Sequence, residues 1–255
     1  MIKGGIDVEY TLEELNEKMA RNGGNLDLSH TQITSLPEGL MVGGSLWLPG
    51  TQITSLPEVL TVGGSLDLRR TRMTVLPRRL KVGRWLDLRD TPITSLPDDI
   101  RIEGSLNLSG TQIKSLPEGL AIGGGLYLRN TPITSLPKGL AVGGNLHLSD
   151  TPITSLPEGL KVGGSLYLSH TPIASLPDGL TVGGDLYLSG TPITSLPEGL
   201  KVGGRVVMER GVVAKVCEGI LLSDILEMII EVIDSSVVFD FAKYVRLRSG
   251  VPQLK

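Results

Sequence analysis

Residues 146–185 read LHLSDTPITSLPEGLKVGGS followed by LYLSHTPIASLPDGLTVGGD, which are two copies of one twenty-residue unit. The unit L-x-L-x-x-T-x-I-x-x-L-P-x-x-L-x-V-G-G-x occurs in nine copies between residues 26 and 205, with substitutions but no insertion. A repeat of this length indicates a stack of structural units, each of which buries apolar surface only against its neighbours. The sequence therefore predicts a solenoid.

The apolar positions of the unit indicate which side faces inward. The two leucines of L-x-L alternate with the period of a strand, so both point toward the core. The isoleucine, the second leucine and the L-x-V pair supply the rest of the interior. The LPEGLxVGG arc contains proline and up to three glycines, which excludes a regular α-helix. We expect an extended, polyproline-like or 3₁₀ return there.

The composition fits many equal aliphatic units. The chain has 33 glycines and 16 prolines but only 2 Trp, 5 Tyr and 2 Phe, and 40% of its 255 residues are hydrophobic. A linker or disordered chain would be far less apolar. The formal net charge of −3 predicts no overall attraction to nucleic acid or membranes. A single cysteine, Cys217, excludes a disulfide framework.

Both ends of the array depart from the unit. Thr11 and Glu14 have the spacing of a capping box, which predicts a capping turn and helix over residues 1–25. Nine repeats then cover residues 26–205. Val213 falls one period after Ile193, which predicts a degenerate tenth repeat over 206–221.

Residues 222–255 are expected to form a C-terminal cap. Four acids make one narrow polar stripe on an otherwise apolar helix, which must be covered on most of its circumference. Residues 237–248 are either a second helix or a strand, and we favour a helical hairpin. Dimerisation or docking of a partner through this helix is the alternative.

The unit resembles the leucine-rich repeat, whose consensus L-x-x-L-x-L-x-x-N-x-L it follows column by column over about 215 residues. Its length and the LP in the return are similar to the LPX repeats of bacterial type III secretion effectors. Threonine replaces the asparagine column of the family, and Gly-Gly replaces the first leucine. The resemblance implies a right-handed α/β solenoid dominated by β structure, with a parallel sheet on its concave face. A straighter parallel β-solenoid is the alternative.

The residue between the paired leucines points out of the sheet and changes along the chain. It is mostly acidic in the first half and aromatic in the second. Side chains on adjacent strands, about 4.8 Å apart, form a continuous face, and Tyr and Trp dominate interface hot spots. We therefore predict a partner-binding face made of Trp47, Asp67, Asp87, Tyr127, His147, Tyr167 and Tyr187, with Trp85, Arg69, Arg89 and Arg129 from adjoining columns.

The residues of this face are also compatible with three alternatives. The side chains would merely stabilise strand pairing, or the tyrosines would stack on a carbohydrate. Ice or surface binding is a minor alternative, because Lys114 and Ala174 interrupt the outward threonine row. The basic residues between Arg69 and Arg89 surround the coil, so they do not form a groove for a phosphate backbone, and no nucleic-acid partner is expected.

No catalytic residue, cofactor site or metal site is expected. His30, His147 and His170 lack the spacing of metal ligands. The sequence has no G-x-S-x-G or G-x-x-x-x-G-K-[ST] motif. Ubiquitin-ligase effectors with LPX repeats carry a separate catalytic domain with a cysteine nucleophile, whereas Cys217 falls at the proline position of the repeat.

The sequence thus predicts a non-enzymatic scaffold with a protein partner, a monomer or a dimer through the C-terminal cap. No signal peptide or membrane-spanning run is seen, which predicts a soluble protein. It is expected to be cytoplasmic or to be delivered into a host cell by a non-cleaved secretion route. The resemblance alone implies the delivery and an effector-like role.

Overall fold

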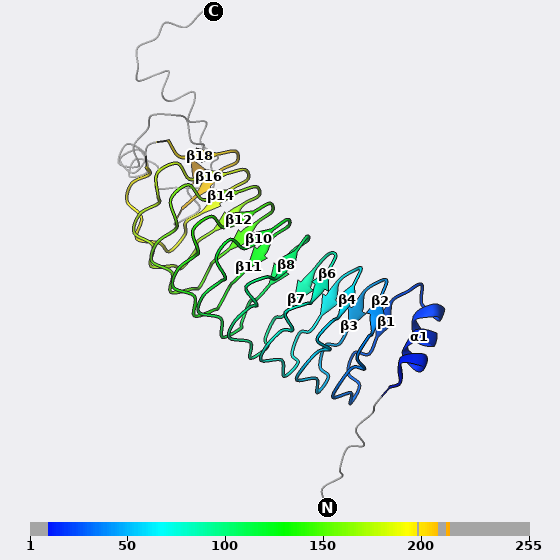
Figure 1. The fold of residues 1–255 in the computed structure, drawn as a ribbon. Coiled ribbons are helices and arrows are strands. Elements are labelled where there is room, and N and C mark those ends of the chain that lie inside the picture. The colour runs from blue at the N-terminus through cyan, green and yellow to red at the C-terminus, as the bar shows by residue number, and fades with distance from the viewer. Residues whose placement is uncertain (1–9, 198, 209–212, 215–255) are drawn as a thin grey trace, which may run out of the picture.

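The computed structural model describes residues 10–197, 199–208 and 213–214. In this part of the chain one helix is followed by parallel turns that form a gently curved stack (Figure 1). The predicted solenoid is therefore present. The predicted cap over 222–255, and the question of helix or strand over 237–248, lie outside the described residues.

Helix α1 (Leu12–Arg21) closes the N-terminal end of the stack, as the capping box predicts. The Glu14 N–H donates to Thr11 Oγ1 at 3.2 Å, and the Thr11 N–H donates to Glu14 Oε2 at 2.8 Å. Leu15 and Met19 lie on one side of the helix and are buried in the same core as the first turn. The helix thus covers apolar surface that the first repeat would otherwise expose.

The first two residues of each L-x-L segment form a strand of sheet A, to which each turn adds one parallel strand. Leu126 pairs with Leu106 on one side and Leu146 on the other, so identical side chains stack along the core. The parallel strands of sheet A are β1 (Leu26–Asp27), β3 (Leu46–Trp47), β5 (Leu66–Asp67), β7 (Leu86–Asp87), β9 (Leu106–Asn107), β11 (Leu126–Tyr127), β13 (Leu146–His147), β15 (Leu166–Tyr167), β17 (Leu186–Tyr187) and β19 (Val206–Val207).

The strand that follows β19 in sheet A runs in the opposite direction. Strand β20 (Val213–Ala214) pairs antiparallel with β19, a direction that differs from the parallel register expected from the alignment of Val213 with Ile193. The sequence has Gly211 where every complete repeat has the threonine that ends its L-x-L segment.

The return arcs contain a second parallel sheet, sheet B, which the sequence did not lead us to expect. Leu40 and Val42 are buried while Met41 is exposed, which is the alternation of a strand. The backbone pairs with the preceding turn, as when the Gly63 N–H donates to Val42 O at 2.8 Å. The strands are β2 (Met41–Val42), β4 (Thr61–Val62), β6 (Lys81–Val82), β8 (Arg101–Ile102), β10 (Ala121–Ile122), β12 (Ala141–Val142), β14 (Lys161–Val162), β16 (Thr181–Val182) and β18 (Lys201–Val202).

The threonine column, which stands at the place of the asparagine in the family consensus, faces inward. Thr111 is fully buried, and its hydroxyl donates to Leu108 O at 2.6 Å. Thr51, Thr71, Thr91, Thr131, Thr151 and Thr171 are buried and make the same bond. Each hydroxyl thus satisfies a carbonyl three residues earlier, a local bond that replaces an asparagine ladder between turns.

The glycine pair between sheets B and A allows successive turns to approach closely. A Cβ on Gly144 would lie 2.8 Å from Gly124 C, closer than side chains tolerate. The Gly144 N–H donates to Gly124 O at 2.8 Å, whereas at Arg84, which replaces glycine in this column, the bond to Gly64 O lengthens to 3.1 Å. A side chain in this column is thus accompanied by a longer hydrogen bond to the preceding turn.

We predict that Gly144→Ala lowers the free energy of unfolding by about 1–2 kcal/mol, since overpacking against backbone is not relieved by rotamer changes. Urea denaturation followed by circular dichroism measures the change. Gly43→Ala is the matched control, because a Cβ on Gly43 has nothing within 4 Å. Equal losses in the two variants would show that close approach is not the reason for glycine in this column.

Candidate partner-binding face

The outer surface of sheet A differs in composition from the rest of the repeats. We call this surface the sheet A face and define it by four positions in each turn. They are the outward residue of the strand, the residue two places before it, and the residues two and three places after it. Among the described residues, these positions contain five arginines but no lysine or glutamate. Lysine and glutamate lie instead on sheet B, as at Lys81 and Lys161, or in the segments just before and after its strands, as at Glu38, Glu118 and Glu103.

Four rings on this face form a continuous stack, which we call the ring ladder: Tyr127, His147, Tyr167 and Tyr187. The centroids of Tyr127 and His147 are 4.9 Å apart. Those of His147 and Tyr167 are 3.7 Å apart, and those of Tyr167 and Tyr187 are 4.5 Å apart. The planes differ by 24° or less, so the rings are nearly parallel. The two inner rings have a neighbour on both faces, so they present their edges to solvent.

The ends of the ring ladder are held by the residue two places before each tyrosine. At Tyr127 that residue is Gly125, where a Cβ would lie 2.9 Å from the ring atom Cε2, so the ring occupies the space of a missing side chain. At the other end the Tyr187 hydroxyl donates to Asp185 Oδ2 at 3.1 Å. Hydrogen bonds from Arg205 hold the pKa of Asp185 at about 2. Asp185 is therefore an ionised acceptor at neutral pH.

Burial within the stack, with the nearby charge of Arg129, lowers the pKa of His147 below its ordinary value of 6.5. The folded state therefore binds a proton less readily than the unfolded chain does. The stabilisation from neutral His147 is present above pH 6.5 and is lost as the pH falls through the folded pKa.

We predict that His147→Tyr, which keeps a ring in the ladder, reduces the loss of stability between about pH 7.5 and about pH 5.5. Thermal unfolding midpoints of both proteins at the two pH values measure this difference. Since other groups titrate in both proteins, only the difference between the two slopes is informative. An NMR titration that places the pKa of His147 at or above 6.5 would contradict the prediction.

A second group on the face, the arginine pair Arg69 and Arg89, is fixed by two carboxylates. Arg69 Nη2 lies 2.6 Å from Asp67 Oδ2, and Arg89 Nη2 lies 2.7 Å from Asp87 Oδ2. Arg69 Nε also lies 3.4 Å from Asp87 Oδ2, which links the two turns. Trp85 is 40% exposed, and its ring centroid lies 5.9 Å from Arg89 Cζ.

The two acids of the predicted site are largely buried. Asp67 and Asp87 are only 8% and 3% exposed, and each accepts the N–H of the arginine two residues later at 3.1 Å. Asn107 accepts the Ser109 N–H in the same way. The outward direction of this column is as predicted, but Asp67 and Asp87 are enclosed by the arginine side chains that they bind.

Two predicted residues, Trp47 and Arg129, belong to neither group, although Arg129 lies near His147. Trp47 is half-buried between the strands of Asp27 and Asp67. Arg129 is exposed and its Nε lies 2.9 Å from Asp150 Oδ2. The structure thus brings together the ring ladder, and separately Asp67, Arg69, Trp85, Asp87 and Arg89, whereas Trp47 and Arg129 join neither group.

Sequence reasoning missed a polar column that precedes each L-x-L segment. Asn145 Oδ1 accepts the Ser165 N–H at 2.8 Å, and Ser165 Oγ accepts the Asp185 N–H at 3.0 Å. The recurrence of Ser, Asn and Asp before L-x-L was the available signal. Trp85 and Gly125 interrupt the column within the described turns, beside the arginine pair and the ring ladder. Loss of a local stabilising contact next to exposed aromatic groups is typical of functional surfaces.

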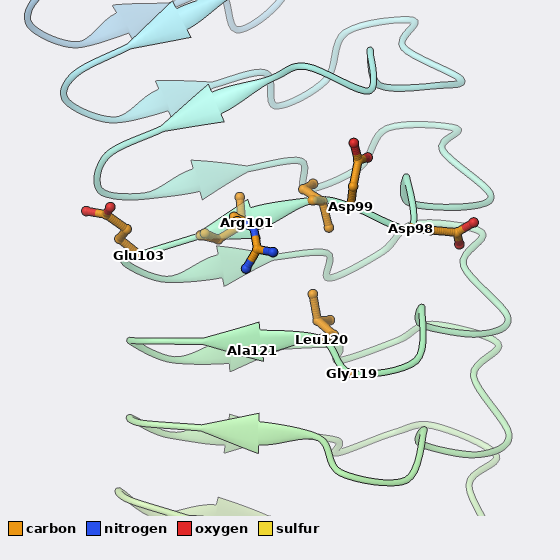
Figure 2. A pocket seen from close by; sticks show the side chains of 9 residues that line it. Asp98, Asp99, Arg101, Glu103, Gly119, Leu120 and Ala121 are labelled. Carbon is orange, nitrogen blue, oxygen red and sulfur yellow. The ribbon is translucent and has the colours of Figure 1, made fainter.

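Another cluster of charged side chains lies on sheet B, around a depression near β8 and β10. It is lined by Asp98, Asp99, Arg101 and Glu103, with Gly119, Leu120 and Ala121 below. Figure 2 shows Asp98, Asp99 and Glu103 pointing in different directions, so their carboxylates do not converge.

The side chains that commonly bind metals are dispersed over the described turns. Among the described residues, no group of three His, Cys, Asp or Glu side chains is placed to hold a metal ion. No helix in the same part of the chain has the length and apolar character needed to cross a membrane.

No family model and no curated protein sequence matches the chain. Among solved structures it is similar to YopM, a leucine-rich effector protein from Yersinia pestis, with 19% identity and a TM-score of 0.50. The match covers 75% of this chain and 64% of that one, so this chain spans less than two thirds of YopM.

Two further matches have lower TM-scores. YopM from Yersinia enterocolitica WA-314 has 20% identity over 71% of this chain and 51% of that one, with a TM-score of 0.35. A leucine-rich-repeat protein of Leptospira interrogans has 17% identity over 64% and 71%, with a TM-score of 0.26. The twenty-residue parallel turns and the match to YopM of Yersinia pestis together show that this chain has the fold of a leucine-rich-repeat solenoid.

Proposed function

We propose that the chain is a non-enzymatic scaffold that binds a protein partner on the sheet A face. The observation that carries the proposal is the separation of residue types around the coil. Among the described repeats, Tyr and Trp occur only on the sheet A face, which also has five of the ten arginines, while Lys and Glu are confined to other surfaces. Protein interfaces are enriched in the first group and depleted in the second.

The geometry of the ring ladder favours a protein over a carbohydrate. A sugar stacks on a free ring face, but both faces of His147 and Tyr167 are covered by neighbouring rings. Ring edges carry positive partial charge and attract carbonyl and carboxylate oxygens. An effector role, as named for YopM, and delivery into a host cell belong to the same proposal, as does a monomeric or dimeric state.

The proposal is tested by affinity capture with three purified proteins, followed by quantitative mass spectrometry. They are the wild type, the ring variant Tyr127→Ala/Tyr167→Ala/Tyr187→Ala, and a sheet B control, Lys81→Ala/Arg101→Ala/Lys161→Ala. The control changes exposed side chains on the other sheet. We expect a protein that is retained by the wild type and the control and released by the ring variant.

Equal retention by all three proteins would refute the proposal, provided that circular dichroism shows each to be folded. A glycan array run in parallel addresses the carbohydrate alternative. Glycan binding that disappears in the ring variant, without a captured protein, would replace the protein partner by a carbohydrate.

A further inference from the structure

We infer that the arginine pair, Arg69 and Arg89, is the anchor for an extended acidic segment of a protein partner, whose carboxylates bind the free edges of the two guanidinium groups. The inference rests on the proposed function, because it assigns a chemical class of partner to the sheet A face. It depends on the N–H donors that remain on each arginine, on the burial of the aspartates beneath the exposed arginines, and on the spacing of the turns.

Each guanidinium has donors left after it binds its own aspartate. Arg69 Nε donates to Asp67 Oδ1 at 2.9 Å and Arg69 Nη2 to Asp67 Oδ2 at 2.6 Å. Arg89 binds Asp87 in the same way, at 3.0 and 2.7 Å. Arginine has five N–H donors, of which this side-on geometry uses two. Within the described residues Nη1 of neither arginine forms a hydrogen bond, so the Nη1–Nη2 edge remains available for a second bidentate carboxylate.

The charges are arranged in two levels, with the negative groups below. The side chains of Asp67 and Asp87 are 11% and 4% exposed, whereas those of Arg69 and Arg89 are 41% and 36% exposed. A partner therefore meets positive charge first, although the four groups together are neutral. The hydrogen bonds to the aspartates also fix the guanidinium groups before binding, which lowers the conformational entropy lost in a complex.

The spacing of the arginine pair fits an extended peptide that runs along the stack. The two arginines are on consecutive turns, and adjacent parallel strands are about 4.8 Å apart. In an extended peptide, side chains two residues apart lie on one face and about 6.8 Å apart. Flexible arginine and glutamate side chains span this difference, so acidic residues at alternate positions reach both anchors. Trp85, beside Arg89, offers apolar surface to the intervening residues.

The test uses fluorescein-labelled peptides and the full chain, with binding measured by fluorescence anisotropy. One peptide alternates Glu and Thr, and the other alternates Gln and Thr. We expect the wild type to bind the Glu peptide at least about tenfold more tightly, since charge-assisted hydrogen bonds are replaced by neutral ones. The preference is expected to disappear in Asp67→Asn/Arg69→Gln/Asp87→Asn/Arg89→Gln, which removes acid and base together and leaves no buried charge unpaired.

The matched control is Glu17→Gln/Arg21→Gln, which removes an exposed ion pair on α1, away from the sheet A face. It is expected to bind both peptides as the wild type does. The two pairs are also changed separately, so that at least one folded variant is available if the fourfold variant is unstable. Circular dichroism establishes folding in each case.

Equal affinity for the two peptides, or a Glu preference that survives loss of both pairs, would overturn the inference. Tighter binding of oligo-dT or of a phosphopeptide, lost in the same variants, would also overturn it by assigning the anchor to phosphate. If the peptide test fails while the ring variant still releases its captured protein, the proposed function stands and only the acidic anchor is wrong.

Discussion

Leu126→Ala is expected to lower the free energy of unfolding by about 2–5 kcal/mol, the range for truncation of a fully buried leucine. Leu126 is 0% exposed and stacks between Leu106 and Leu146. Its neighbours are held by the backbone, as when the Leu126 N–H donates to Asn145 O at 2.8 Å. The turns cannot close around the cavity without breaking such bonds, so most of the lost contact energy remains lost.

Urea denaturation followed by circular dichroism measures the change in free energy. Tyr127→Ala, one residue away, is the control, because Tyr127 is half-buried and stacks on one ring only. Its expected cost is about 0.5–1.5 kcal/mol, the energy of an aromatic pair. A loss in Leu126→Ala no greater than in the control would contradict the inward assignment of the L-x-L leucines.

The sequence alone sufficed to predict the inward residues of the unit. Burial of the leucines and of the threonine follows from periodicity and from the family consensus, and nine copies make the pattern unambiguous. The capping box of α1 was equally predictable, because Thr11 and Glu14 interact locally. These features depend on residues within one unit or one helical turn.

Features that depend on contacts between neighbouring turns could not be predicted in the same way. A strand as short as Met41–Val42 exists only because adjacent turns supply its hydrogen-bond partners. The stacking of His147 on Tyr167 requires the actual distance between turns. The reversal after β19 follows from the pairing of β20, for which the repeat pattern gives no partner.

The burial of Asp87 shows why the predicted site needed the structure. From the alternation of L-x-L, an acid between two leucines is assigned to solvent, and its backbone direction is indeed outward. The side chain is enclosed because Arg89 turns back over it and Arg69 reaches it from the preceding turn. The rotamers of Arg69 and Arg89 cannot be predicted from residue type and spacing alone.

Removal of one arginine is expected to have the second large effect on stability. Arg89→Met is predicted to cost about 3 kcal/mol, near the lower end for breaking a buried ion pair, because Arg89 itself is partly solvated. In this variant the Asp87 carboxylate, whose side chain is 4% exposed, keeps two contacts. They are the hydrogen bond from the backbone N–H of residue 89 and the 3.4 Å contact with Arg69 Nε. The present hydrogen bond to Asp87 raises the pKa of the Arg89 guanidinium, so Arg89 stays charged across the neutral range.

The expected cost of Arg89→Met comes from the unpaired acid and not from lost packing. Methionine keeps an apolar chain in place of the arginine stem, and urea denaturation of Asp87→Asn/Arg89→Met is expected to recover most of the loss. Arg70→Met is the exposed comparison: its Nε lies 3.8 Å from Asp90 Oδ2, and both side chains are largely exposed. Such a pair contributes about 0–1 kcal/mol. If Arg89→Met costs no more than Arg70→Met, Asp87 is hydrated in solution, and the two-level charge arrangement that orients the arginine pair toward a partner does not exist.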